Sequence, residues 1–269
     1  MPAQSIAQSA SWSVFYRRWG RLRPPLRPHA DVCALMRRTV AAHAGRTLLL
    51  GVTPELARLR DRTVAVDFCE ASLTHIWPGD GPGRRAIMGN WLELPCAAGT
   101  FSAVLGDGSF NCLEYPAGYQ RVFDELARVV QPGGRIVVRM YVTPDGADSI
   151  EQTRRCTMSG GVRAIDALKW RLAHAVCAET GDANVPVQAI REAFNRAFPD
   201  RRALLRATGW SSVDLATMDA YALLPDVFSF PTLRQVLSLV PATMCRARFV
   251  RTWGYELAER CPALVMDRR

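Results

Sequence analysis

One segment, residues 47–67 with the sequence TLLLGVTPELARLRDRTVAVD, restricts the fold more than any other part of the chain. Apolar runs at 47–50 and 63–66 predict two short strands, and the segment between them predicts a helix that follows a turn at Gly51. A strand, a tight turn, a helix and a second strand ending in an acidic residue form the opening unit of nucleotide-binding α/β folds. Asp67 follows Gly51 by 67 − 51 = 16 residues, near the ~20 residues typical of that unit.

The turn after the first predicted strand has features that suit a ligand. Gly51 lacks a Cβ, so a ligand could approach the backbone closely there. Thr53 suits the N-cap of a helix and Pro54 its first position, and the free N–H groups of that helix would face an anionic part of a ligand. Asp67 would accept hydrogen bonds from a ribose diol. Since the turn has one glycine where a dinucleotide fingerprint has three, an ordinary turn without a ligand is the alternative interpretation.

Strand and helix patterns alternate over residues 46–142, which predicts a parallel, doubly wound sheet. Further strands are expected at 85–88, 101–105 and 135–142, and an amphipathic helix at 117–130. In such sheets, ligands bind at the carboxyl ends of the strands. Glycines and polar residues gather at these predicted ends: Gly51, Thr53, Asp67, Asn90, Asp107 and Ser109.

The segments around this alternating region are helical in pattern. Residues 146–209 contain no strand pattern, so we expect an inserted helical cap that lies over the strand ends and shapes a substrate pocket. One strand within 210–222 and a last strand at 261–266 would complete the sheet. The chain is therefore expected to comprise an N-terminal helical extension (1–45), a ligand-binding core (46–145), a helical insertion (146–209) and a C-terminal completion of the core (210–269).

Two groups of side chains outside the core could contact a ligand. An aromatic stripe in the N-terminal extension consists of Trp12, Phe15, Tyr16 and Trp19. We expect this stripe to pack onto the main domain, and closure over a ligand is the alternative. Four arginines of the insertion would either steer an anionic substrate or form a solvated helix face: Arg154, Arg155, Arg163 and Arg171.

Composition excludes several classes of protein. The longest apolar runs fall short of the ~18 residues of a membrane span, and the first residues lack the order of a secretory signal, so a cytoplasmic protein is expected. The 8 cysteines show no metal-ligand spacing, so no metal site is predicted.

The net charge of +9 comes almost entirely from arginine, with Lys169 the only lysine. Such a surface favours anions, including nucleic acid, without choosing among them.

Taken together, the order of motifs resembles the class I S-adenosylmethionine-dependent methyltransferases. The resemblance is carried by LLLGVTPEL, AVDFCEASL, MGNWLELP, SAVLGDGSFNCL and FDELARVVQPGGRIVVRMY, within about residues 46–142. It implies a Rossmann-like, mostly parallel sheet with helices on both faces and S-adenosylmethionine as the cofactor. One departure stands out, because GVTPEL replaces the GxGxG that relatives carry after the first strand.

The resemblance also implies roles for individual residues. Gly51 and the adjoining turn would face the methionine part of the cofactor, and Asp67 would hold the ribose hydroxyls. Asn90 and the backbone of Trp91 would meet the adenine, whereas Gly106 and Asp107 would lie beside the methionine or the acceptor. The expected cofactor-binding set is Gly51, Val52, Thr53, Asp67, Phe68, Asn90, Trp91, Gly106, Asp107 and Ser109.

Methyl transfer needs positioning of donor and acceptor more than it needs a dedicated catalytic group. Asp107 is the single candidate for a polar role at the acceptor, with a cofactor contact or a structural turn as alternatives. A methyltransferase acting on a small molecule is the favoured function. A nucleic-acid or protein methyltransferase, and a non-catalytic methyltransferase-like binding or regulatory protein, are the alternatives; a nicotinamide dehydrogenase is disfavoured because its glycine fingerprint is missing.

Overall fold

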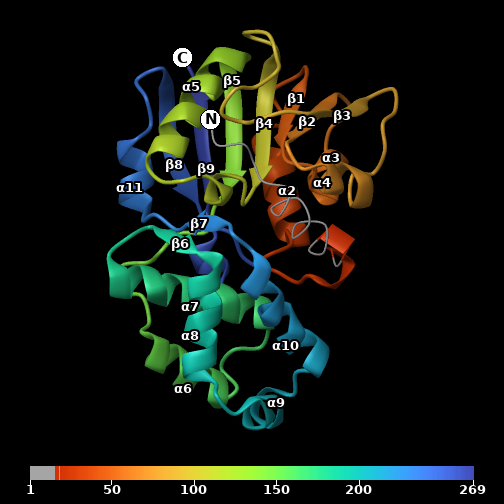
Figure 1. Ribbon diagram of the computed structural model, residues 1–269. Helices are drawn as coiled ribbons and strands as arrows, with labels where there is room; N and C mark the ends of the chain where they lie inside the picture. Colours follow the sequence, from red (N-terminus) through yellow and green to blue (C-terminus); the bar gives the residue numbers. More distant parts are fainter. Residues whose placement is uncertain (1–15, 18) are drawn as a thin grey trace.

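The computed structural model describes residues 16, 17 and 19–269, which form a sheet domain joined to a helical lobe (Figure 1). The sheet has the order β3-β2-β1-β4-β5-β9-β8. Its first five strands pair in parallel, and the last two are antiparallel. The strands are β1 (Thr47–Leu50), β2 (Thr63–Asp67), β3 (Arg84–Met88), β4 (Phe101–Asp107), β5 (Val130–Arg139), β8 (Met244–Val250) and β9 (Ala263–Arg268). The predicted doubly wound, mostly parallel α/β fold is confirmed.

Helices cover both faces of this sheet because successive side chains of each strand point to opposite sides. Leu48 and Leu50 pack in one apolar cluster, and Leu49 between them packs in another. The first cluster includes side chains of α5 (Ala117–Val129) and α11 (Leu233–Ser238). The second includes side chains of α2 (Ala30–Thr39), α3 (Pro54–Ala57) and α4 (Glu70–His75). The continuous apolar runs at β1 and β2 are explained by this burial on both sides.

The helical lobe lies at the carboxyl ends of the parallel strands (Figure 1). Its apolar cluster is organised around α7 (Ile165–Thr180), which is buried over most of its length. The other helices are α6 (Ile150–Met158), α8 (Val187–Ala197), α9 (Arg201–Thr208) and α10 (Ser212–Asp219). A two-stranded sheet of β6 (Asn184–Pro186) and β7 (Val227–Ser229) lies where the lobe meets the main domain.

Several local predictions were wrong. The strand expected within 210–222 is α10, whose N-cap Ser211 forms a capping box with Asp214. β8 and the β6–β7 pair were missed, and β5 begins at Val130 and ends at Arg139 instead of covering 135–142.

The N-terminal segment contributes a short 3₁₀ turn, η1 (Trp19–Arg21), before α2. Trp12 and Phe15 of the aromatic stripe lie outside the described residues, whereas Tyr16 and Trp19 lie within them. Among the helices that are described, none is long and apolar enough to cross a bilayer.

Candidate functional site

A pocket with about 880 Å³ of empty space, open solvent at its mouth included, lies at the carboxyl ends of the parallel strands. Three parts of the chain line it: the strand-end loops, the N-terminal segment and the helical lobe with its connection to β7. From the strand-end loops come Leu50, Gly51, Val52, Thr53, Asp67, Trp91, Asp107, Gly108 and Ser109. Seven of the ten residues predicted for the cofactor are in that group; Phe68, Asn90 and Gly106 do not line the pocket.

The loop after β1 has the tight geometry that its glycine permits. Gly51 has φ +92°, a conformation that L side chains rarely adopt, and its N–H donates to the Val66 carbonyl at 2.9 Å. A Cβ built on Gly51 would lie 3.7 Å from the Trp91 ring and 3.8 Å from Asp67 Oδ2. Backbone strain therefore restricts this position to glycine more than lack of space does.

The helix that follows is shorter than the sequence indicates. α3 has 4 residues, with Pro54 in its first turn as predicted. Thr53 stands at the N-cap as predicted, but its side chain makes no capping hydrogen bond. A single turn has only a small dipole. Thr53 is nevertheless buried and lines the pocket, which places its side chain beside any ligand held there.

Asp67 is a buried carboxylate at the end of β2. It is 4% exposed, and its Oδ1 accepts from the Cys69 N–H at 2.8 Å. Burial raises the pKa of this carboxyl to about 6, against the opposing effect of hydrogen bonds from Cys69, Ser72 and Phe68. A buried carboxylate that faces a pocket and has no counter-ion among these influences suits hydroxyl donors such as those of a ribose.

The loop after β3 places Trp91 and Asn90 differently from each other. Trp91 is buried, lines the pocket and donates from Nε1 to the Val66 carbonyl at 2.6 Å. Asn90 Oδ1 instead accepts from the Leu92 N–H at 2.9 Å and closes its own turn. Phe68 packs edge-on against Trp91 with ring centroids 6.4 Å apart, outside the pocket lining.

Gly106, near the end of β4, makes room for the Ser109 side chain, because a Cβ on Gly106 would come within 2.5 Å of Ser109 Oγ.

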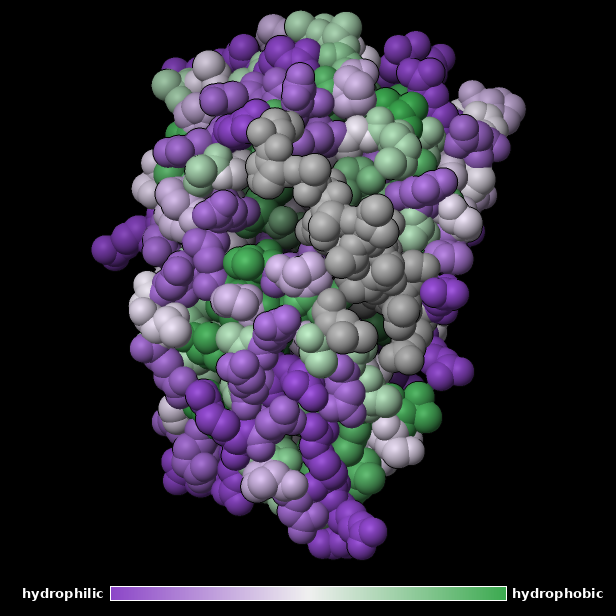
Figure 2. All heavy atoms as spheres, viewed as in Figure 1, coloured by the Kyte–Doolittle hydropathy of each residue, from purple (hydrophilic) through white to green (hydrophobic). Residues whose placement is uncertain are grey.

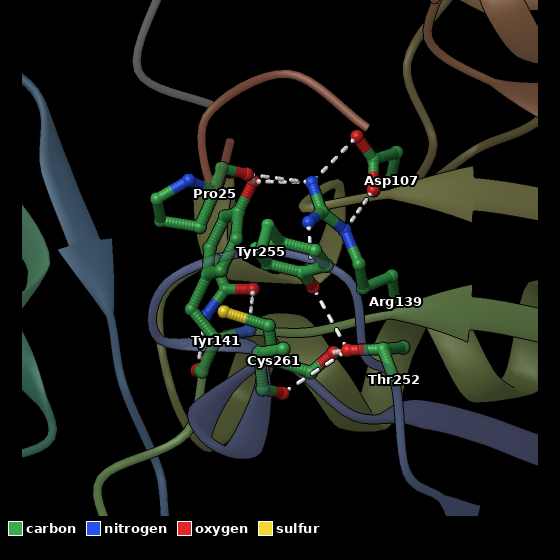
Figure 3. Close-up of polar contacts among 9 residues, drawn as sticks. Pro25, Asp107, Arg139, Tyr141, Thr252, Tyr255 and Cys261 are labelled. Atoms are coloured by element: carbon green, nitrogen blue, oxygen red, sulfur yellow. Dashed lines mark hydrogen bonds and ion pairs between the residues drawn. The ribbon is translucent and has the colours of Figure 1, made fainter. Parts of the chain in front are cut away.

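Asp107, the candidate catalytic residue, is held in a buried ion pair with Arg139 at the end of β5 (Figure 3). The guanidinium donates from Nε to Asp107 Oδ1 and from Nη2 to Oδ2, the latter at 2.9 Å. The Asp107 side chain is 2% exposed and that of Arg139 is not exposed. Burial raises the pKa of the Asp107 carboxyl, and Arg139 acts in the opposite direction. Both carboxylate oxygens are thus engaged, which favours a structural role over proton transfer at an acceptor.

Arg139 also ties the N-terminal segment to the strand ends (Figure 3). Its Nη2 donates to the Pro25 carbonyl at 2.7 Å and its Nη1 to the Tyr255 hydroxyl at 3.0 Å. The Tyr141 hydroxyl donates to the same Pro25 carbonyl at 3.0 Å. One buried cation therefore holds together β4, β5, the loop before β9 and the segment that contains Leu26, which lines the pocket.

Aromatic side chains outside the core complete the pocket. Tyr16 and Trp19 of the aromatic stripe line it, together with Trp170 and Tyr221 from the lobe and Phe228 from β7. Sequence analysis missed the last three as site residues. Their apolar character alone is typical of a core, and only the fold brings them to the strand ends.

The four arginines of the insertion do not line the pocket. Arg154 and Arg155 lie near Glu151 and Arg171 near Asp148, while Arg163 is exposed. Figure 2 shows a largely hydrophilic surface on this face of the helical lobe. Arg154, Arg155 and Arg163 thus lie on the solvated surface, the second of the two interpretations, whereas the Arg171 side chain is only 16% exposed. Among the described residues no group of three or more His, Cys, Asp or Glu side chains is arranged to hold a metal ion.

Comparisons with known proteins agree with this geometry. Residues 51–138 match the family model of a methyltransferase domain. The chain is 32% identical over 167 residues to a demethylmenaquinone methyltransferase of Mycolicibacterium gilvum, and the match covers 60% of this chain and 64% of that protein. A demethylmenaquinone methyltransferase of Mycobacterium sp. (strain KMS) is 34% identical over 165 residues, covering 60% and 63%. The match spans slightly less than two thirds of these relatives.

Solved structures share the architecture at low identity. The N-methyltransferase NodS of Bradyrhizobium japonicum WM9, in complex with S-adenosyl-L-homocysteine, is 11% identical with a TM-score of 0.53, covering 96% of this chain and 98% of that one. A protein of Rhodobacter sphaeroides, described as a candidate Zn-dependent alcohol dehydrogenase, is 14% identical with a TM-score of 0.61, covering 98% and 100%. At these identities both likenesses show the fold alone.

Proposed function

We propose that the protein transfers a methyl group from S-adenosylmethionine to a small-molecule acceptor, a proposal supported by the match of residues 51–138 to the family model of a methyltransferase domain. The observation that carries the proposal is the convergence of Gly51, Asp67 and Ser109, from three neighbouring strand ends, on one pocket. The acceptor class is supported by the relatives, which are named for a small molecule, demethylmenaquinone.

The residues present fit the cofactor. The Asp67 carboxylate would accept from the ribose hydroxyls, Trp91 would lie against the adenine, and Gly51 with Val52 and Thr53 would border the methionine part. Asn90 would contribute through the turn that its side-chain oxygen closes with the Leu92 N–H. Cofactor binding is thus assigned to residues 46–145 and the shaping of the acceptor site to the helices of 146–209. A cytoplasmic location is part of the proposal, supported by free thiols at all eight cysteines, which lie within the described residues.

S-Adenosylmethionine would supply an electrophilic methyl group. A lone pair of the acceptor would form the new bond to the methyl carbon as the carbon–sulfur bond breaks, and the electron pair of that bond would stay on sulfur to give S-adenosylhomocysteine. The acceptor's proton would pass to water. The protein's contribution is to orient both molecules and to exclude solvent. The rigid strand ends and the aromatic lobe provide the orientation, and the covering segment with Tyr16 and Trp19 restricts access of water.

Calorimetric titration of the purified, cofactor-free chain with S-adenosylmethionine, S-adenosylhomocysteine and NAD tests the proposal. We expect binding of the first two and none of NAD. Asp67→Ala should weaken binding about 10- to 100-fold, since hydrogen bonds to a charged group contribute about 1.5–3 kcal/mol each. Asp61→Ala, which removes an exposed carboxylate outside the pocket, is the matched control. Absence of binding would favour a non-catalytic methyltransferase-like protein, and tight, salt-sensitive RNA or DNA binding would favour a nucleic-acid methyltransferase.

A further inference from the structure

The lobe side of the pocket is an aromatic wall. Trp170 is 2% exposed, and its ring lies 5.0 Å from that of Tyr141 and 5.6 Å from that of Phe228, measured between centroids. Tyr221 and Leu224 extend this wall. Rings fixed by their neighbours present a flat apolar surface at little cost in side-chain entropy, which suits a flat apolar ligand.

The ionisable groups on this side are uncharged near neutral pH. Burial raises the pKa of the Tyr141 and Tyr221 hydroxyls. No lysine or arginine is among the described residues that line the pocket. An anionic ligand would therefore be buried here without a cationic partner, which is unfavourable.

A cation behind this wall is already neutralised by an ion pair. Lys169 Nζ lies 5.5 Å from the Tyr221 ring centroid, and it donates to Asp166 Oδ1 at 2.8 Å. Both side chains of this pair are almost fully buried. The pair forms part of the support behind Tyr221 and adds no net charge to the pocket.

Two polar atoms of the lining have no hydrogen-bond partner among the described residues. They are Ser109 Oγ and Trp170 Nε1, both buried. An unsatisfied buried polar group costs about 1–3 kcal/mol, and such groups call for an explanation. The two residues belong to one continuous surface, because a Cβ on Gly108, next to Ser109, would lie 2.7 Å from the Tyr141 ring that packs on Trp170.

We propose that this half of the pocket is an acceptor subsite for a flat, uncharged aromatic ring that carries an oxygen substituent. The ring packs against Trp170, Phe228 and Tyr221. The oxygen accepts from Trp170 Nε1 or pairs with the Ser109 hydroxyl. This inference rests on the proposed function, since it assigns the acceptor to the part of the pocket that lies away from Asp67.

To test this, the full chain is first saturated with S-adenosylhomocysteine and is then titrated calorimetrically with 2-naphthol. Three comparison ligands each change one property: decahydro-2-naphthol lacks the flat ring, naphthalene lacks the oxygen, and 2-naphthalenesulfonate carries a charge. For 2-naphthol we expect a Kd on the order of 0.1–1 mM, as its small size allows. The saturated and the charged ligands should bind at least about tenfold more weakly.

Two conservative variants separate a ligand contact from a structural role. Trp170→Phe keeps the ring and removes the N–H, and Ser109→Ala removes the hydroxyl without disturbing an existing bond. At least one of them should weaken 2-naphthol about 2- to 10-fold, the usual effect of one neutral hydrogen bond, and leave naphthalene unchanged. Trp253→Phe, at a side chain that is 47% exposed and outside the pocket, should change neither.

The possible outcomes distinguish this inference from the proposed function. If S-adenosylhomocysteine binds but 2-naphthol does not, or if decahydro-2-naphthol or the sulfonate binds equally well, the acceptor assignment is overturned and the proposed function stands. Unchanged 2-naphthol affinity in both pocket variants also overturns it. If S-adenosylhomocysteine itself does not bind, both proposals fail.

Discussion

Replacing Arg139 by Met should destabilise the protein strongly, because this guanidinium is the centre of a buried network. It is fully buried, it donates to both oxygens of Asp107, and it also reaches the Pro25 carbonyl and two tyrosine hydroxyls. Its loss leaves an uncompensated carboxylate that is 2% exposed. Breaking one side of a buried pair costs about 3–5 kcal/mol. For 269 residues, an unfolding entropy of about 2.1 cal/mol/K per residue converts 4 kcal/mol into a fall in Tm of about 7 °C.

Urea denaturation of Arg139→Met, Asp107→Leu and the double variant measures this network directly. We expect each single variant to lose about 3–5 kcal/mol and the double variant to lose much less than the sum, because an apolar pair leaves no buried charge. Arg154→Met, at an exposed pair with Glu151, is the control and should change stability by less than about 1 kcal/mol. Additive single effects, or a loss below about 1 kcal/mol in Arg139→Met, would refute the structural role assigned to Asp107 and Arg139.

Three further predictions follow from individual groups. Affinity for S-adenosylmethionine, measured by calorimetry from pH 8 to pH 5, should fall as the pH drops below about 6, where the Asp67 carboxyl takes up a proton, and Asp67→Asn should abolish this dependence. Gly51→Ala forces a side chain to φ +92° and should cost about 1–3 kcal/mol together with cofactor affinity; normal stability and affinity would contradict the strain argument. Burial lowers the pKa of His174 from 6.5 to about 3, so its contribution to stability is complete above pH 6.5 and is lost as the pH falls. At pH 5 the free energy of unfolding is lower by about 2 kcal/mol. Urea denaturation at pH 8 and pH 5 measures this difference, which should disappear in His174→Leu.

The sequence predicts those features that depend on local order along the chain. The opening unit, the strand ends and seven pocket residues follow from apolar runs and the glycine and acidic residues that end them. The residues that end these runs can be predicted to lie together because the carboxyl ends of parallel strands meet at one edge of the sheet. The cofactor roles given to these residues stay predictions.

The missed features depend on contacts between distant residues. Asp107 and Arg139 end neighbouring strands in register, yet their pairing becomes visible only once β4 and β5 are known to be adjacent. Trp170, Tyr221 and Phe228 resemble ordinary core residues until the lobe folds over the strand ends. The error at α10 has a local cause: an apolar stretch of this length does not distinguish a short helix from a strand, although the Ser211–Asp214 capping box was present in the sequence.

The most direct test of the account is a crystal structure of the full chain with S-adenosylhomocysteine. We predict that the ribose hydroxyls lie within about 2.5–3.0 Å of the Asp67 carboxylate oxygens, that the adenine lies against Trp91, and that the sulfur points toward Ser109 and the aromatic wall. A ligand bound at another place, or one whose ribose does not reach Asp67, would contradict the assignment of this pocket as the methyl-donor site.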